Sequence, residues 1–223
     1  MKNKLLLLIP FFLFLFSCKK ENNFPRIETI TSGSKWGIQI GSSALTVYMQ
    51  LQQLGIQKGF SDVAVVGQQV FSKPEELQSR LPFYSSVTLT SSASVIQRVI
   101  IFFNNDQVSS IEAGGALPEE IDKWPQDGPN EMAIHKDDKL DVLYNKLLTI
   151  YQRPAYSNYI INLPNKTLSK DFDPEMIKYD EWGFGFVADV KPGKSGRSSV
   201  SLFFKNGKLE KINLVYDEVD IYI

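Results

Sequence analysis

FFNNDQVSSI at residues 102–111 and FFKNGKLEKI at residues 203–212 decide the fold of this 223-residue chain. The two segments place their aromatic, asparagine and aliphatic residues at the same positions, 101 residues apart. Apolar residues alternate with a period of two before each turn, as they do in a half-buried β-strand. Asn105-Asp106 and Asn206-Gly207 stand at the turns, and both pairs tolerate the positive φ angles of a type I′ hairpin turn. The sequence therefore predicts two similar β-hairpins.

Two further pairs of segments repeat in the same order upstream of these hairpins. Lys73–Leu77 corresponds to Asp173–Ile177, 100 residues apart, and Leu45–Met49 corresponds to Leu140–Tyr144, 95 residues apart. Three matching blocks in one order indicate a tandem duplication, although helix and hairpin patterns of unrelated origin also look alike. The predicted divisions follow in chain order: signal peptide 1–17, tether 18–33, first copy 34–115, linker 116–132 and second copy 133–223.

Each copy is expected to begin with an amphipathic helix. In the first copy, apolar residues recur at a spacing of three from Leu45 to Leu54, with Ser42-Ser43 as the N-cap and Gly55 as the stop. In the second copy, the same pattern runs from Leu140 to Ile150, after Asp137 or Asp138 as the cap.

A second, shorter helix is expected to start at Pro74 and at Pro174, because proline suits the first helical turn. An extended stretch then precedes each hairpin, at Tyr84–Thr90 and at Trp182–Val190. The predicted fold class is α+β, with two tandem modules that each consist of two helices followed by a small antiparallel sheet. The linker carries glycine and proline loop signals. Its Trp124 is expected to plug the seam between the copies, and ligand binding by this residue is the alternative.

This module resembles the family of small outer-membrane assembly lipoproteins, and its tandem form resembles the β-lactamase inhibitor protein fold. The resemblance rests on the helix pattern from Gly41-Ser42-Ser43 to Leu54-Gly55 and on the closing pattern Phe-Phe-x-Asn-(Asp/Gly)-x-(Val/Leu)-x-x-Ile. The chain departs from these families in its long loops at 56–71 and 152–172 and in its lack of paired cysteines. The resemblance implies protein binding through the sheet face or the loops, without catalysis.

The segment Met1–Cys18, MKNKLLLLIPFFLFLFSC, is expected to direct export and anchoring. Its apolar run of about a dozen residues is too short to span the roughly 30 Å hydrocarbon core of a bilayer. The ending Leu15-Phe16-Ser17-Cys18 resembles a bacterial lipobox, which implies cleavage before Cys18 and acylation of its sulfur; an ordinary signal peptide and an uncleaved anchor are the alternatives. Because no aspartate follows Cys18, known sorting rules imply a lipid-anchored protein of the outer membrane, facing the periplasm or the cell surface.

Histidine and carboxylate side chains are the candidates for catalysis or metal binding. His135 is the single histidine of the chain, which excludes a metal site built from several histidines. Asp171 and Asp173 belong to an acidic cluster that a calcium loop or a glycosidase pair would use, but helix capping by Asp173 explains it more simply. No catalytic residue, metal or cofactor is therefore predicted. The balance of 24 basic and 25 acidic residues also gives no basic footprint for nucleic acid.

Trp182, Phe184 and Phe186 are the candidate partner-binding residues. They alternate with two glycines, so that the three aromatic side chains share one face of a strand. Such a row forms either a platform for sugars or peptides or the core beneath the copy-two helices, and the core interpretation is favoured.

Charge also distinguishes the two copies. Residues 34–115 carry five basic and five acidic residues, whereas residues 133–223 carry thirteen of each. Charge depletion marks the centre of many interfaces, which favours the first copy as the side that meets a partner. The predicted function is a lipid-anchored, non-enzymatic envelope lipoprotein that binds a protein or another envelope component. An envelope glycan hydrolase and an immunity-type inhibitor of a toxin are the alternatives.

Overall fold

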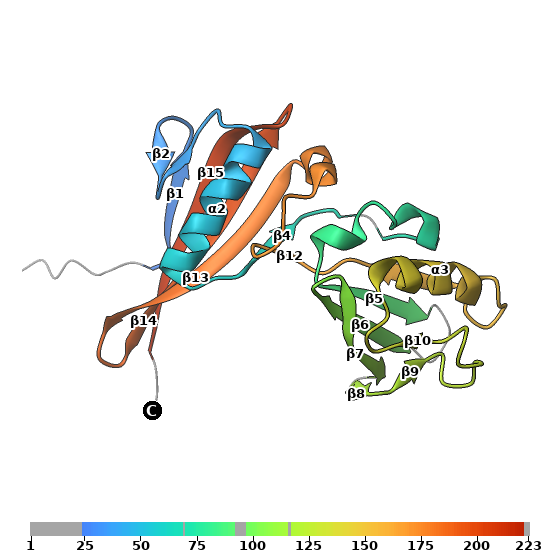
Figure 1. Ribbon diagram of the computed structural model, residues 1–223. Helices are drawn as coiled ribbons and strands as arrows, with labels where there is room; N and C mark the ends of the chain where they lie inside the picture. Colours follow the sequence, from blue (N-terminus) through green and yellow to red (C-terminus); the bar gives the residue numbers. More distant parts are fainter. Residues whose placement is uncertain (1–23, 69, 92–96, 116, 221–223) are drawn as a thin grey trace, which may run out of the picture.

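The computed structural model describes residues 24–68, 70–91, 97–115 and 117–220, so that the predicted signal peptide and Cys18 lie outside the described residues. The chain forms two lobes (Figure 1), and each lobe has its own cluster of buried apolar side chains. We call residues 24–68 together with 164–220 the terminal lobe, and residues 70–163 the central lobe. None of the described helices is long and apolar enough to cross a membrane.

The terminal lobe consists of a six-stranded antiparallel sheet and one α-helix. The strand order is β1-β15-β14-β13-β4-β12. The strands have these bounds: β1 Arg26–Ile30, β4 Asp62–Val65, β12 Lys166–Thr167, β13 Glu181–Lys191, β14 Lys194–Lys205 and β15 Lys208–Asp220. Helix α2, Ala44–Lys58, lies along this sheet (Figure 1) and contributes Val47, Leu51 and Leu54 to the core. A small ribbon of β2, Ser34–Lys35, and β3, Ile38–Gln39, precedes the helix.

The central lobe repeats this arrangement with a five-stranded antiparallel sheet in the order β11-β5-β6-β7-β8. The strands have these bounds: β5 Ser86–Ser91, β6 Arg98–Asn104, β7 Gln107–Gly114, β8 Glu119–Glu120 and β11 Tyr159–Asn162. Helix α3, Leu140–Tyr151, contributes Leu143, Leu147 and Ile150 to the core of this lobe. A separate two-stranded sheet pairs β9, Lys123–Trp124, with β10, Ile134–His135.

The first helix of each copy packs on the sheet that the other copy supplies. Helix α2 belongs to the first copy but shares its core with β13, β14 and β15, whereas α3 of the second copy shares its core with β5, β6 and β7. The attachments are equivalent, because Ser43 forms a β-bridge with Lys208 and Lys139 forms one with Gln107. Strand β4 likewise pairs with β13, and β11 pairs with β5. Each lobe is therefore assembled from both repeats.

The predicted fold class is wrong on two counts. The described chain is mostly β-structure and has two α-helices instead of four, and the modules do not stand side by side as independent copies. The expected second helices are short 3₁₀ turns: η2 Pro74–Glu76, η3 Leu81–Phe83 and η4 Pro174–Lys178. Pro82 lacks the amide that an α-helix through this region would need. In the second copy, only a few residues separate Pro174 from β13, too few to offset the cost of nucleating an α-helix.

The hairpin predictions are confirmed. Strands β6 and β7 meet at Asn105-Asp106, β14 and β15 meet at Asn206-Gly207, and all four turn residues have positive φ angles. The same register shift follows in both hairpins, between Phe102 and Phe103 and between Phe203 and Phe204. The two hairpins therefore share a bulge as well as a turn type.

The helix ends agree with the sequence only in part. Ser43 is the N-cap of α2, and its hydroxyl accepts from the amide of Thr46 at 3.2 Å. The predicted stop is wrong, because Gly55 lies inside α2 and the C-cap is Gly59, which has a left-handed φ of 74°. Gly55 is needed for close packing instead, since a Cβ there would lie 2.6 Å from the carbonyl oxygen of Phe60. The cap of α3 is Lys139 and not Asp137 or Asp138.

A buried ionic cluster, which we call the joint, connects the lobes through Arg80, Tyr84, Lys166 and Asp173. The guanidinium of Arg80 donates to Asp173 Oδ2 from Nε at 2.9 Å and from Nη2 at 2.6 Å, and the hydroxyl of Tyr84 donates to the same oxygen at 2.9 Å. Asp173 also caps η4, as expected, by accepting from the amide of Glu175. Lys166 is fully buried beside the Tyr84 ring, and burial lowers its pKa to about 8.

Candidate functional site

The structure places two of the three candidate partner-binding residues in the core of the terminal lobe. Trp182 is fully buried, with its ring centroid 4.3 Å from that of Phe204, and Phe184 is also buried. Phe186 is only partly buried, next to Trp36 and beneath the ammonium group of Lys58. Core packing thus accounts for Trp182 and Phe184. A partner-binding role for this row stays a prediction, and only Phe186 has side-chain surface that a partner could reach.

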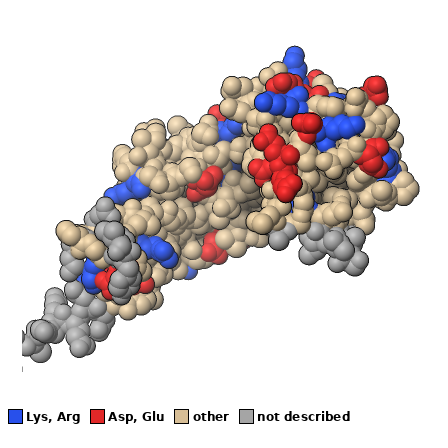
Figure 2. Space-filling model, turned by 90° about the horizontal axis from the view of Figure 1, so that it is seen from below, with Lys and Arg blue, Asp and Glu red and all other residues tan. Residues whose placement is uncertain are grey.

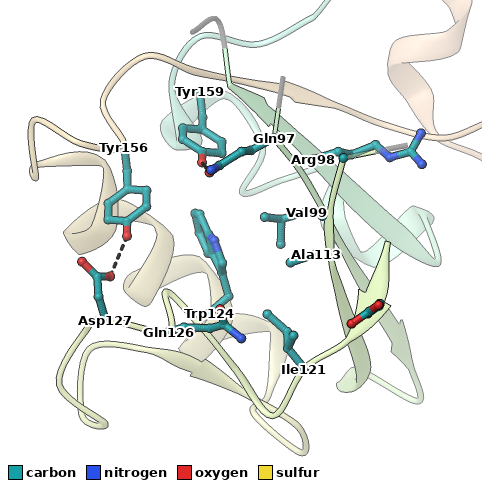
Figure 3. A pocket seen from close by; sticks show the side chains of 13 residues that line it. Gln97, Arg98, Val99, Ala113, Ile121, Trp124, Gln126, Asp127, Tyr156 and Tyr159 are labelled. Atoms are coloured by element: carbon teal, nitrogen blue, oxygen red, sulfur yellow. Dashed lines mark hydrogen bonds between the residues drawn. The ribbon is translucent and has the colours of Figure 1, made fainter. Parts of the chain in front are cut away.

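A pocket of about 560 Å³ opens in the central lobe (Figure 3). We call it the Trp124 pocket. Val99 of β6, Ala113 of β7 and Ile121 form its apolar side, and Trp124 stands opposite them. The lining thus combines the first copy, the linker and the second copy, which supplies Tyr156 and Tyr159.

Three aromatic rings form the wall of the Trp124 pocket. The ring centroid of Trp124 lies 5.3 Å from that of Tyr156 and 5.8 Å from that of Tyr159, and the two tyrosine rings lie 5.8 Å apart. The edge-on and tilted angles are those that aromatic pairs prefer. Trp124 therefore lies between segments of the two copies, but inside one lobe and not at the boundary between the lobes.

Polar contacts hold the rim of the pocket in place. The hydroxyl of Tyr156 donates to Asp127 Oδ1 at 2.6 Å, and Arg153 Nη2 donates to Asp127 Oδ2 at 3.2 Å. The hydroxyl of Tyr159 donates to Gln97 Oε1 at 3.1 Å. The hydrogen bond from Tyr156 lowers the pKa of the Asp127 carboxyl, and burial raises the pKa of Tyr156 to about 12. Near neutral pH, Asp127 is therefore an ionised acceptor with a fixed orientation.

Acidic residues gather beside the pocket. In the pairing of β7 with β8, Glu119 stands opposite Ala113 and Glu120 stands opposite Glu112. Opposite residues of an antiparallel pair share a face of the sheet, so Glu119 lies on the pocket side while Glu112 and Glu120 lie on the reverse side. Seen from below, the central lobe carries a group of acidic side chains (Figure 2), on the side where Figure 1 places β8. Within the described part of the chain, none of these glutamates forms an ion pair.

The described residues contain no group of three or more His, Cys, Asp or Glu side chains that could hold a metal ion. His135 lies in β10, where its Nε2 is 3.0 Å from the carbonyl oxygen of Asn130 and its amide donates to Asp138. A glycosidase needs one carboxylic acid with a raised pKa, whereas the pKa of Asp127 is lowered. The lowered pKa of Asp127 therefore does not suit this residue to the role of the acid in a glycosidase.

Trp124 stands out in the sequence, but the residues that form a pocket around it do not. The aromatic partners Tyr156 and Tyr159 follow α3, and Gln97 and Val99 lie near the start of β6. The one local signal was an aromatic residue beside proline in the linker, Trp124-Pro125. Comparison with protein-family models, curated proteins and solved structures finds no match to this chain. The resemblance to outer-membrane assembly lipoproteins therefore stays a prediction.

Proposed function

We propose that this protein is a lipid-anchored, non-enzymatic protein of the cell envelope that binds a protein or another envelope component in the Trp124 pocket. The observation that carries this proposal is the prearranged pocket itself: a hollow of about 560 Å³ that has one apolar side and one aromatic wall, with polar groups already fixed at its rim. Binding sites for ligands combine these two properties, because apolar contacts supply affinity and a few oriented polar groups supply specificity. The lipobox-like ending at Cys18 supports the anchored location.

Native co-purification tests this function. The lipidated chain, tagged at its C-terminus, is expressed in its own host and extracted in mild detergent, with Cys18→Ala as the unanchored control. Ala113→Leu places a larger side chain in the pocket, and Ile56→Glu is the matched surface control, because Ile56 is 81% exposed on α2 of the other lobe. The expected result is a stoichiometric companion that is lost with Ala113→Leu and retained with Ile56→Glu.

The surface of α2 is the competing location for binding. Leu45, Met49 and Ile56 are exposed on this helix, and its residues carry no charge before Lys58. If the folded Ala113→Leu variant retains the companion and Ile56→Glu loses it, the assignment of binding to the pocket is wrong. Thermal unfolding of both variants establishes that each one is folded.

A further inference from the structure

We infer that the occupant of the Trp124 pocket is a basic peptide segment of a partner protein, which inserts one apolar side chain and places a Lys or Arg beside Glu119. This inference rests on the proposed function and specifies the ligand of the same site. It follows from two properties of the pocket: the close packing of its aromatic rings and the position of Glu119 on its rim.

The aromatic wall favours an inserted side chain over a stacked sugar. Trp124 and Tyr159 are each only 5% exposed, because their rings contact each other and Tyr156 edge-on or tilted. A flat ligand that stacks requires an open ring face, whereas the rings of Trp124 and Tyr159 are almost fully covered. The space that they line together with Val99 and Ala113 therefore suits an inserted side chain better than a stacked ring. A pocket of about 560 Å³ is wide enough for one large side chain and its neighbouring backbone.

The charge at the rim favours a basic ligand. Asp127 is ionised but already paired with Arg153. Arg98 also lines the pocket, but it extends its guanidinium away from Trp124 (Figure 3). Glu119 is therefore the charged side chain on the pocket side that a ligand can pair with. A Lys or Arg of the ligand beside Glu119 supplies the opposite charge on the pocket side. An apolar side chain next to Lys or Arg combines both requirements in one peptide.

Binding of synthetic heptapeptides to the full lipidated chain in detergent micelles tests this inference. The first peptide has a central phenylalanine with two lysines on each side, the second replaces the lysines with glutamates, and the third replaces the phenylalanine with serine. Only the first peptide is expected to bind well, with affinity that falls as salt is added. Glu119→Gln should weaken this binding about fivefold, the upper range for an exposed ion pair. Ala113→Leu should abolish it, and the remote control Glu210→Gln should leave it unchanged.

The outcomes separate the ligand class from the function. If the glutamate peptide binds as well as the lysine peptide, or if Glu119→Gln has no effect, the basic ligand is refuted while a binding pocket stands. If a tetrasaccharide of N-acetylglucosamine binds in a manner that Ala113→Leu abolishes, and no peptide binds, the ligand is a glycan. If none of the peptides binds, the inference fails. The glutamates of β8 would then serve only to keep this sheet edge from pairing with another strand. The proposed function itself is refuted only if Ala113→Leu also leaves the co-purified companion in place.

Discussion

Replacing Asp173 with asparagine tests how strongly a single charge at the joint stabilises the protein. The side chains of Arg80 and Asp173 are 5% and 1% exposed, and two donor atoms of the guanidinium reach one carboxylate oxygen. Asparagine has nearly the same size and remains a good N-cap, so the end of η4 is preserved. The substitution therefore leaves a buried guanidinium without an opposing charge.

The expected loss in the free energy of unfolding is about 3 kcal/mol. Breaking a buried ion pair from one side costs about 3–5 kcal/mol, and the lower end applies because the asparagine oxygen still accepts a hydrogen bond. Asp127→Asn is the matched control, since that carboxylate also accepts from an arginine and a tyrosine but its side chain is 63% exposed. Exposed pairs contribute less than about 1 kcal/mol, so this control should lose little stability.

Urea unfolding at neutral pH, followed by tryptophan emission and by circular dichroism, measures both losses. The double variant Arg80→Met with Asp173→Asn should recover much of the stability, because it removes the unpaired cation together with its partner. The reasoning is refuted if Asp173→Asn costs no more than Asp127→Asn. It is also refuted if the losses of the two joint substitutions simply add, since residues of one buried network do not act independently.

Three further predictions follow from the fold and from the burial of individual groups. A fragment of residues 70–163 should melt cooperatively on its own because it holds the complete core of the central lobe. A fragment of residues 34–115 should not, because its helix α2 lacks the sheet on which it packs. A cooperative melt of the second fragment would contradict the exchange of helices. Burial lowers the pKa of Lys166 to about 8 in the folded state, so above that pH this side chain binds more protons in the unfolded chain, and its contribution to stability grows as the pH rises. Tyrosines such as Tyr48 and Tyr84, whose pKa burial raises, act in the opposite direction as the pH approaches 10. Between pH 8 and about 9, stability in urea should therefore rise relative to that of Lys166→Met, and a constant difference between the two proteins would count against this. Gly55→Ala should destabilise by about 1–3 kcal/mol, despite the better helix propensity of alanine, because its Cβ would lie 2.6 Å from the carbonyl oxygen of Phe60; a higher melting temperature would disprove the close contact.

Features that depend on a few neighbouring residues were predictable from the sequence. The turns at Asn105-Asp106 and Asn206-Gly207 and the cap at Ser43 each follow from local backbone preferences. The choice of sheet for each helix was not predictable in this way. An amphipathic helix specifies that one face is buried, but the two copies offer similar apolar sheet faces, and periodicity does not distinguish between them.

The candidate site was less predictable than the fold. Ala113, Trp124 and Tyr156 become neighbours only because β7, β9 and the segment after α3 meet at one end of the central lobe. The row of Trp182, Phe184 and Phe186 gave a stronger local signal, yet alternation alone does not tell an exposed aromatic face from a buried one. Two of these three residues are buried because α2 covers the same face of the sheet.

Because each helix packs on the sheet of the other copy, the central lobe of a newly made chain can be completed before the terminal lobe, although the chain begins with residues of the terminal lobe. The central lobe has all its core residues once residue 163 has emerged, whereas α2 must wait for β13, β14 and β15. Until then, its apolar residues Val47, Leu51 and Leu54 have no sheet to cover them. A chain whose synthesis stops before residue 203 would therefore contain a complete central lobe and an incomplete terminal lobe. The last hairpin completes the terminal lobe, and chaperones that meet the unfinished chain should recognise the uncovered N-terminal helix.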